Sequence, residues 1–258
     1  MLSYQHIYHA GNLADVHKHA VLAWMLSQLI KKDKPLTYLE THSGRALYRL
    51  DAAEALKTGE AAQGITRAEA LNWFPETHPY AEVIRLTHAE NGANSYPGSP
   101  MIASQILRPA DRMHLAELHP QEFAALDYAM PKAKCYQMDG FEMAQSVCPP
   151  DPRRGLLLID PSYEVKRDYE FIPGQIATLH RKWNVGIIML WYPILSDGPH
   201  RKMLRALMQA HPDALRHEVS FPPARKGHRM VGSGLFILNP PYRLDTETDR
   251  LSALFAAL

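Results

Sequence analysis

Short apolar runs alternate with helical segments along most of this 258-residue chain, and this alternation constrains the fold more than any other feature. The runs lie at residues 36–41, 113–118, 133–138, 155–159 and 185–190. Between them, segments such as 120–130 and 174–183 suit helices, and the hydrophobic spacing of residues 15–32 predicts an amphipathic helix. A strand that is apolar on both faces has to be covered on both faces. We therefore expect an α/β fold with a parallel, doubly wound sheet, which residues 217–221 and 234–238 complete as an antiparallel pair.

Residues 45–98 differ from the rest of the chain because they contain helical patches and no clear strand. Prolines interrupt these patches, so the helices should be short. We expect an inserted helical subdomain at 45–98, and a single Rossmann-like domain built from residues 1–44 and 99–258.

Composition excludes several classes of protein. The formal net charge is +1, so any nucleic-acid site has to come from a local basic patch. No apolar stretch is long enough to cross a membrane, and residues 1–12 do not have the pattern of a signal peptide. The two cysteines fit no zinc spacing and are expected to be reduced thiols. These observations predict a cytoplasmic protein.

The most informative motif is Asp160-Pro161-Ser162-Tyr163, which directly follows the apolar run at 155–159. It resembles the Asp/Asn-Pro-Pro-Tyr motif of amino-group methyltransferases. An exocyclic adenine amine is a poor nucleophile and gains positive charge as it attacks a methyl group. The Asp160 carboxylate and the Pro161 carbonyl can accept hydrogen bonds from the two N–H groups, and these hydrogen bonds strengthen as that charge develops. The Tyr163 ring can stack on an extruded base. Taken alone, the four residues equally suit a strand that ends beside a buried tyrosine.

Polar residues at three other predicted strand ends suggest cofactor contacts. Residues 40–44 can form a tight turn, Glu117 can accept from ribose hydroxyls, and Asp139-Gly140 can bind an adenine amine. Each acid could also be a helix cap. No Gly-x-Gly-x-x-Gly follows the first strand, which argues against a nicotinamide or flavin enzyme. The set favours S-adenosylmethionine, which has no phosphate.

A second motif, Asn239-Pro240-Pro241-Tyr242, follows another apolar strand and matches the amine-methyltransferase pattern even better. Only a short tail comes after it, too little to complete a sheet without a permuted fold. We therefore assign catalysis to the motif at 160–163 and read the second motif as the end of the last strand.

Basic and imidazole side chains form two further groups. Arg225, Lys226 and Arg229 lie in a loop before the last strand, and Arg201, Lys202 and Arg205 precede them. We expect the loop residues to contact phosphates of the substrate. The histidines gather near the N-terminus, at positions 6, 9, 17 and 19. With no companion acids in a ligand spacing, we expect no metal site there, and polar contacts to cofactor or RNA instead.

Several segments together resemble the bacterial family of large-subunit rRNA adenine-N6 methyltransferases J. The matching segments are residues 1–18, 32–44, 96–100, 116–120, 138–141, 153–164, 190–193 and 232–242. The resemblance implies a Rossmann-like class I S-adenosylmethionine-dependent methyltransferase fold with a small helical insertion. It also implies methylation of one adenine of 23S rRNA, and it places the motif at 239–242 at the end of the last strand.

The resemblance also implies roles for individual residues. It places near S-adenosylmethionine the residues Lys18, His19, His42, Ser99, Glu117, Asp139, Gly140 and Asp160. Asp160 takes the catalytic acceptor role, and Tyr4 is expected beside the entrance for substrate or cofactor. The chain departs from the family pattern at Ser162, where a second proline is usual, and in the segment after His42, which has fewer glycines than expected.

The resulting hypothesis is N6-methylation of an adenine in 23S rRNA, either naked or in a pre-50S particle, by a monomeric enzyme. Two alternatives stay open. One is the same chemistry on DNA adenine or a protein glutamine amide. The other is a catalytically inactive RNA-binding protein with the same fold, for which Ser162 is the only support. A nicotinamide oxidoreductase would require the glycine-rich turn that this chain lacks.

Overall fold

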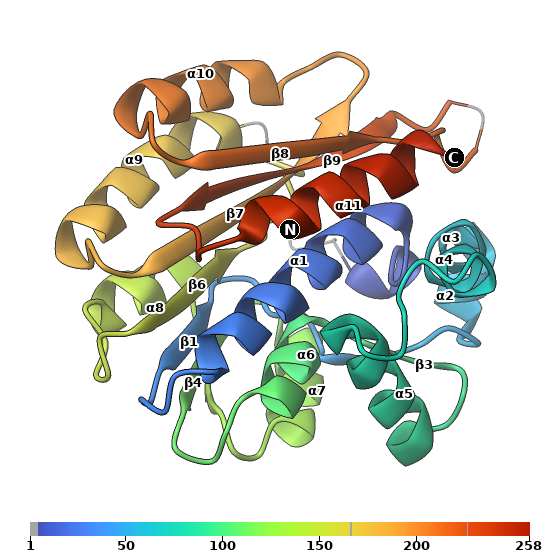
Figure 1. The fold of residues 1–258 in the computed structure, drawn as a ribbon, viewed down its shortest axis with the longest axis horizontal. Coiled ribbons are helices and arrows are strands. Elements are labelled where there is room, and N and C mark those ends of the chain that lie inside the picture. The colour runs from blue at the N-terminus through green and yellow to red at the C-terminus, as the bar shows by residue number, and fades with distance from the viewer. Residues whose placement is uncertain (1–4, 166, 226) are drawn as a thin grey trace.

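A computed structural model describes residues 5–165, 167–225 and 227–258, so the predictions for Tyr4 and Lys226 lie outside the described residues. The core is a seven-stranded sheet in the order β5-β4-β1-β6-β7-β9-β8 (Figure 1). The strands are β1 (Thr37–Glu40), β4 (Arg112–Ala116), β5 (Lys134–Tyr136), β6 (Gly155–Ile159), β7 (Ile187–Leu195), β8 (Leu215–Ser220) and β9 (Met230–Leu238). Five of them are parallel, whereas β9 is antiparallel to β7 and to β8. The predicted doubly wound sheet with its final antiparallel pair is confirmed.

Helices cover both faces of the sheet, as the doubly apolar strands require (Figure 1). One layer contains α1 (Leu13–Ile30), α6 (Ser99–Ile106), α7 (Pro120–Ala129) and α11 (Leu244–Ala256). The other contains α8 (Gly140–Val147), α9 (Asp168–Lys182) and α10 (His200–Ala210). Alternate residues of β6 enter different cores: Leu156 and Leu158 pack under the first layer, Leu157 and Ile159 under the second. This period of two follows from the pleat of the strand.

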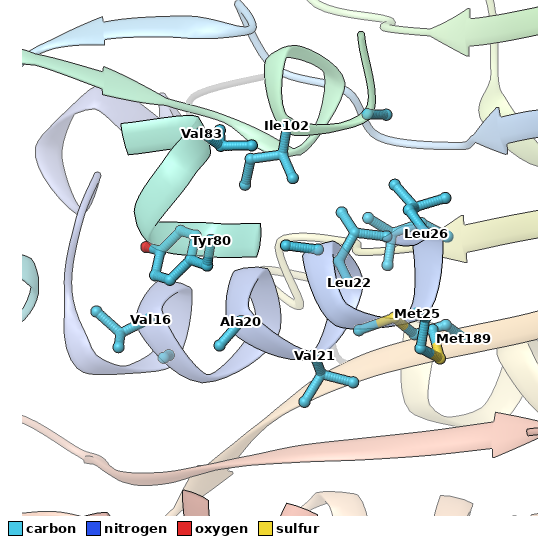
Figure 2. Packing of buried hydrophobic residues seen from close by; sticks show 14 of the residues in the cluster. Val16, Ala20, Val21, Leu22, Met25, Leu26, Tyr80, Val83, Ile102 and Met189 are labelled. Atoms are coloured by element: carbon cyan, nitrogen blue, oxygen red, sulfur yellow. The ribbon is translucent and has the colours of Figure 1, made fainter. Parts of the chain in front are cut away.

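Helix α1 is the exception to the predicted surface pattern. Residues 13–23 are all buried, although an amphipathic helix should expose one face. Figure 2 shows why: Val16, Ala20 and Leu22 lie among side chains of several elements, including Tyr80 and Ile102. The amphipathic prediction for this half of the helix was therefore wrong, because neighbouring helices and the sheet enclose it. Its polar residues are consequently buried groups that need partners.

Residues 45–98 form a chain of short helices: α2 (Ala53–Thr58), α3 (Glu60–Gln63), α4 (Ile65–Ala70) and α5 (Pro79–Asn91). The expectation of no strand was wrong, since β2 (Leu47–Arg49) and β3 (Ser95–Pro97) pair as an antiparallel ribbon. Each is three residues long, too short for an alternation to show in sequence. The ribbon joins the two ends of the segment. The division of the chain into two domains stays a prediction.

Because β1, β4, β5 and β6 run in the same direction, the residues after them gather at one edge of the sheet. The N-terminal half of α1 lies beside that edge, preceded by a short 3-10 turn, η1 (His6–Tyr8). No helix in the described part of the chain combines the length and apolarity that a membrane span needs.

Candidate active site

A cavity of about 700 Å³ lies at this edge of the sheet. Its wall brings together residues that the sequence keeps far apart: Lys18, His19, His42, Ser99, Glu117, Asp139, Gly140, Asp160, Pro161, Tyr163 and Arg229. These are all the predicted cofactor and catalytic residues, together with one predicted phosphate contact. Their placement around one cavity is a structural finding, whereas their individual roles stay predictions.

A buried trio of charges forms one side of the cavity. Lys18 Nζ lies 2.5 Å from Asp160 Oδ2 and 3.0 Å from Asp15 Oδ1. Burial alone would lower the pKa of Lys18, but the two carboxylates outweigh it and raise that pKa above its ordinary value. Burial likewise opposes ionisation of Asp15, yet His6, Lys18 and His19 hold its pKa well below the usual range. With both carboxylates ionised, the trio carries one negative charge beside the cavity.

The Asp160 side chain is accessible from the cavity, since 13% of its surface is exposed. Only Oδ2 is bonded to Lys18, and the described residues give Oδ1 no hydrogen-bond partner. The carboxylate is thus fixed by one oxygen, and its other oxygen can accept from a ligand. The residue follows β6 directly, so the strand sets its position.

Tyr163 adopts a backbone conformation that is rare for an aromatic residue, with φ of +56°. Such a left-handed residue costs on the order of 1 kcal/mol or more, and strain of this kind concentrates at functional sites. Its hydroxyl donates to the Trp191 carbonyl at 2.8 Å, and its ring packs 4.7 Å from that of Tyr169. The ring is mostly buried but belongs to the cavity wall. Its stacking on a base stays a prediction.

Strand β1 ends on a buried acid, Glu40, which the sequence analysis placed in the predicted turn at residues 40–44. Glu40 accepts hydrogen bonds from the hydroxyls of Tyr38 and Ser99. Burial raises its pKa to about 8, and the two donated hydrogen bonds only partly offset this effect. The Ser43 hydroxyl, three residues after the end of β1, is buried without a partner among the described residues. An unpaired buried hydroxyl beside a cavity is a candidate ligand contact.

Glu117 and Asp139 hold the backbone around the cavity. Glu117 accepts from the backbone N–H of Gly44 and of His119, both at 2.8 Å, and burial raises its pKa. Asp139 caps α8 through Oδ1, as the alternative interpretation of a strand-end acid anticipated. Gly140 is required for close packing, because a Cβ there would overlap the Thr41 carbonyl. These contacts leave Asp139 Oδ2 without a hydrogen-bond partner among the described residues.

A chain of buried hydrogen bonds supports Trp191, another residue of the cavity wall. Trp191 Nε1 donates to Ser233 Oγ at 2.9 Å, and that hydroxyl also bonds His17 Nδ1 at 2.8 Å. His17 Nε2 lies 2.9 Å from His217 Nδ1. Burial lowers the pKa of both imidazoles, most strongly that of His17. His17 and His19 point to different partners, since His19 bonds the Tyr96 hydroxyl. His17 therefore serves the packing of Trp191 and does not reach the cavity.

The predicted basic loop is only partly at the site. Arg229 lines the cavity, and its guanidinium pairs with Asp197. Arg225 is exposed and is not part of the cavity wall. The structure brings no three His, Cys, Asp or Glu side chains of the described residues together as a metal would require. The residues that sequence reasoning missed are Asp15 and Trp191. Only Asp15 left a signal, its spacing of three residues from Lys18 on one helix face.

The cavity suits a nucleoside cofactor without phosphates. It lies at the carboxyl ends of parallel strands and has acids after β4, β5 and β6. The unpartnered Ser43 hydroxyl is a feature that a bound small molecule would explain. This fold, with a cavity at the carboxyl ends of its parallel strands, is that of the Rossmann-like class I methyltransferases. The predicted fold class is therefore confirmed.

Comparison with known proteins narrows the class. Residues 33–257 match the family described as "Ribosomal RNA large subunit methyltransferase D, RlmJ". The chain is 37% identical to "Ribosomal RNA large subunit methyltransferase J" of Escherichia coli strain K12, over 97% of this chain and 91% of that protein. The Haemophilus influenzae protein of the same name is also 37% identical, over 96% and 90%. The crystal structure of protein LPL1258 from Legionella pneumophila is 35% identical and superposes with a TM-score of 0.86, covering 96% and 93%. The chain belongs to the RlmJ family.

Proposed function

We propose that this protein transfers a methyl group from S-adenosylmethionine to the N6 amine of one adenine in 23S rRNA. The single observation that carries the proposal is the Asp160-Pro161 turn at the cavity, with its carboxylate fixed by buried Lys18. Family membership supports the rRNA substrate, because the matched relatives are named for the ribosomal large subunit. We also propose that the substrate is naked rRNA or a pre-50S particle, and that the enzyme acts as a cytoplasmic monomer.

The residues around the cavity have distinct roles in this proposal. Glu117, Asp139 and Gly140 would hold the nucleoside part of S-adenosylmethionine, and the loop at 41–44 its methionine part. The cofactor side of the cavity would be completed by His42, Ser99, Lys18 and His19. When bound, the cofactor supplies an electrophilic methyl group on a sulfonium.

The buried charged residues would act directly on the reacting amine. The Asp160 Oδ1 atom and the Pro161 carbonyl would accept hydrogen bonds from the two N–H groups of the amine and so direct its lone pair. Positive charge develops on that nitrogen, next to a trio whose net charge is −1. Preformed electrostatic stabilisation of this kind acts on the transition state more than on the bound substrate. The Tyr163 and Trp191 rings would hold the extruded base, and Arg229, Arg225 and Lys226 would contact flanking phosphates.

The test is a map of N6-methyladenine in 23S rRNA, obtained by mass spectrometry from cells with and without the gene. We expect one mark to disappear with the gene and to return with the wild-type protein but not with Asp160→Ala. An unchanged map would contradict the proposal. Methyl incorporation into purified DNA and protein would then separate the alternative amine substrates from an inactive RNA-binding protein.

A further inference from the structure

A second hollow, of about 630 Å³, opens between α10 and the strands β7 and β8. Three arginines line it: Arg201 and Arg205 from α10, and Arg216 from β8. We call this hollow the arginine groove. None of these residues belongs to the wall of the first cavity, so the groove is a separate feature of the surface.

The charges in the arginine groove do not cancel. The one acid in its wall, Glu218, is held by Arg216 at 2.6 Å and by the Tyr192 hydroxyl at 2.8 Å. Arg201 and Arg205 are exposed, and neither has an acidic partner among the described residues. Because they are four positions apart on one helix, both side chains lie on the same face. The groove therefore has two uncompensated positive charges, in a chain with a net charge of only +1.

Part of the groove wall is apolar and consists of Ile194, Leu204 and Met208. His200 lies there too, with 6% of its surface exposed, and its Nδ1 has no partner among the described residues. Burial lowers the pKa of His200, so this imidazole offers a hydrogen bond and not a charge. Paired arginines beside apolar side chains suit a nucleotide, whose phosphate binds guanidinium while its sugar and base cover apolar atoms.

The groove adjoins the proposed active site. Leu195 lines both hollows, and strand β7 supplies Trp191 to the first and Ile194 to the second. Ser196, in the groove, donates its backbone N–H to the carbonyl of Arg229, in the cavity wall. A strand of RNA that leaves the cavity past Leu195 would enter the groove within a short distance.

We propose that the arginine groove binds the phosphodiester backbone of rRNA next to the target adenosine. The assignment rests on the proposed function and adds a site to it: Arg201, Arg205 and Arg216 hold the flanking nucleotides, while the cavity holds the base. Phosphate contacts of this type set position and affinity without taking part in methyl transfer.

The test compares the double variant R201A/R205A with the matched control R85A/K132A. Arg85, in α5, and Lys132, after α7, are also exposed, and these elements lie far from α10 (Figure 1). Binding of protein-free 23S rRNA transcript is measured across a salt series. We expect R201A/R205A to bind about tenfold more weakly, with the salt slope of log K reduced by about 1.5. In methyl transfer we expect a raised KM and an unchanged kcat, and R201K/R205K should restore binding.

The assignment would be overturned if R201A/R205A bound the transcript as tightly as the control variant does, whether or not both bind more weakly than the wild type. A double variant that binds the transcript normally but fails to methylate a pre-50S particle would indicate an acidic protein partner and would also overturn it. Because binding is measured without turnover, the result does not depend on methyl transfer. A wild-type protein that binds RNA through the groove but transfers no methyl would contradict only the proposed function.

Discussion

Two similar four-residue motifs in this chain lie in opposite environments. Asp160-Pro161-Ser162-Tyr163 lines the cavity, and its tyrosine is buried with 8% of its surface exposed. Asn239-Pro240-Pro241-Tyr242 is not part of the cavity wall, and its tyrosine is 88% exposed. The Asn239 amide donates to the carbonyls of Asn184 and Gly186, so it ties two loops together. The motif that matches the consensus better has a structural role.

Strand direction explains the difference. The first motif follows β6, which is parallel to β1, whereas the second follows β9, which is antiparallel to β7. The carboxyl ends of these strands therefore lie at opposite edges of one sheet, and only one edge has the cavity. Two similar motifs thus gain or lose access to a ligand according to the direction of the preceding strand.

The largest expected effect separates the two motifs directly. Asp160→Ala removes the acceptor for the amine and should lower single-turnover methyl transfer by about 10³-fold or more. Asn239→Ala should leave transfer unchanged and lower the free energy of unfolding by about 1–2 kcal/mol, since two backbone carbonyls lose their donor. Labelled methyl transfer to 23S rRNA and urea unfolding measure the two quantities. Loss of transfer in Asn239→Ala would make the second motif catalytic.

The cation beside each motif gives the next contrast. Lys18→Met leaves the Asp15 and Asp160 carboxylates buried without their cation, and should cost about 3 kcal/mol of stability together with most of the activity. Arg243, which lies over the Tyr242 ring, is exposed. Arg243→Gln should change stability by less than about 0.5 kcal/mol. Denaturant unfolding checks both, and comparable losses would mean that the buried trio has no special importance.

The free energy of unfolding should depend on pH because of Glu40, which ends β1, the strand beside β6 and the first motif. The unfolded chain ionises this carboxyl near its ordinary pKa of 4.5, whereas the folded protein keeps the proton up to about 8. The unfolded state therefore binds fewer protons between these values, and the free energy of unfolding falls as pH rises. The slope reaches about 1.4 kcal/mol per pH unit. Urea unfolding from pH 5 to 8 should show this slope in the wild type and a flatter one in Glu40→Gln. Identical profiles would show that Glu40 ionises normally.

The smallest contrast uses the two tyrosines. Tyr163→Phe removes the hydrogen bond to the Trp191 carbonyl and should cost about 1 kcal/mol of stability. Tyr242→Phe changes an exposed hydroxyl and should leave the thermal midpoint unaltered. Differential scanning calorimetry resolves the two. If both variants behave like the wild type, the hydroxyl of Tyr163 does not hold the turn.

Much of the fold could be predicted because continuous apolar strands have one stable solution, a sheet covered on both faces. The predicted strand at 155–159 coincides with β6, and the final antiparallel pair is present. The ribbon β2–β3 could not be predicted, since three-residue strands have no detectable periodicity. The buried half of α1 was also missed. Its polar residues resemble an exposed face until the tertiary structure supplies partners such as Asp160 for Lys18 and Ser233 for His17.

By itself the sequence determined the order and type of the principal strands and the residues that end them, because hydrophobic period and turn chemistry are local properties. Through its motifs it also determined the family. The sequence favoured the motif at 160–163, and the tertiary structure placed that motif at a cavity. Only the tertiary structure decided that Asp15 and Trp191 belong to the site, and that three arginines form a groove beside it. Each of these facts depends on strand direction or on contacts between residues far apart in the chain, and no local pattern encodes them.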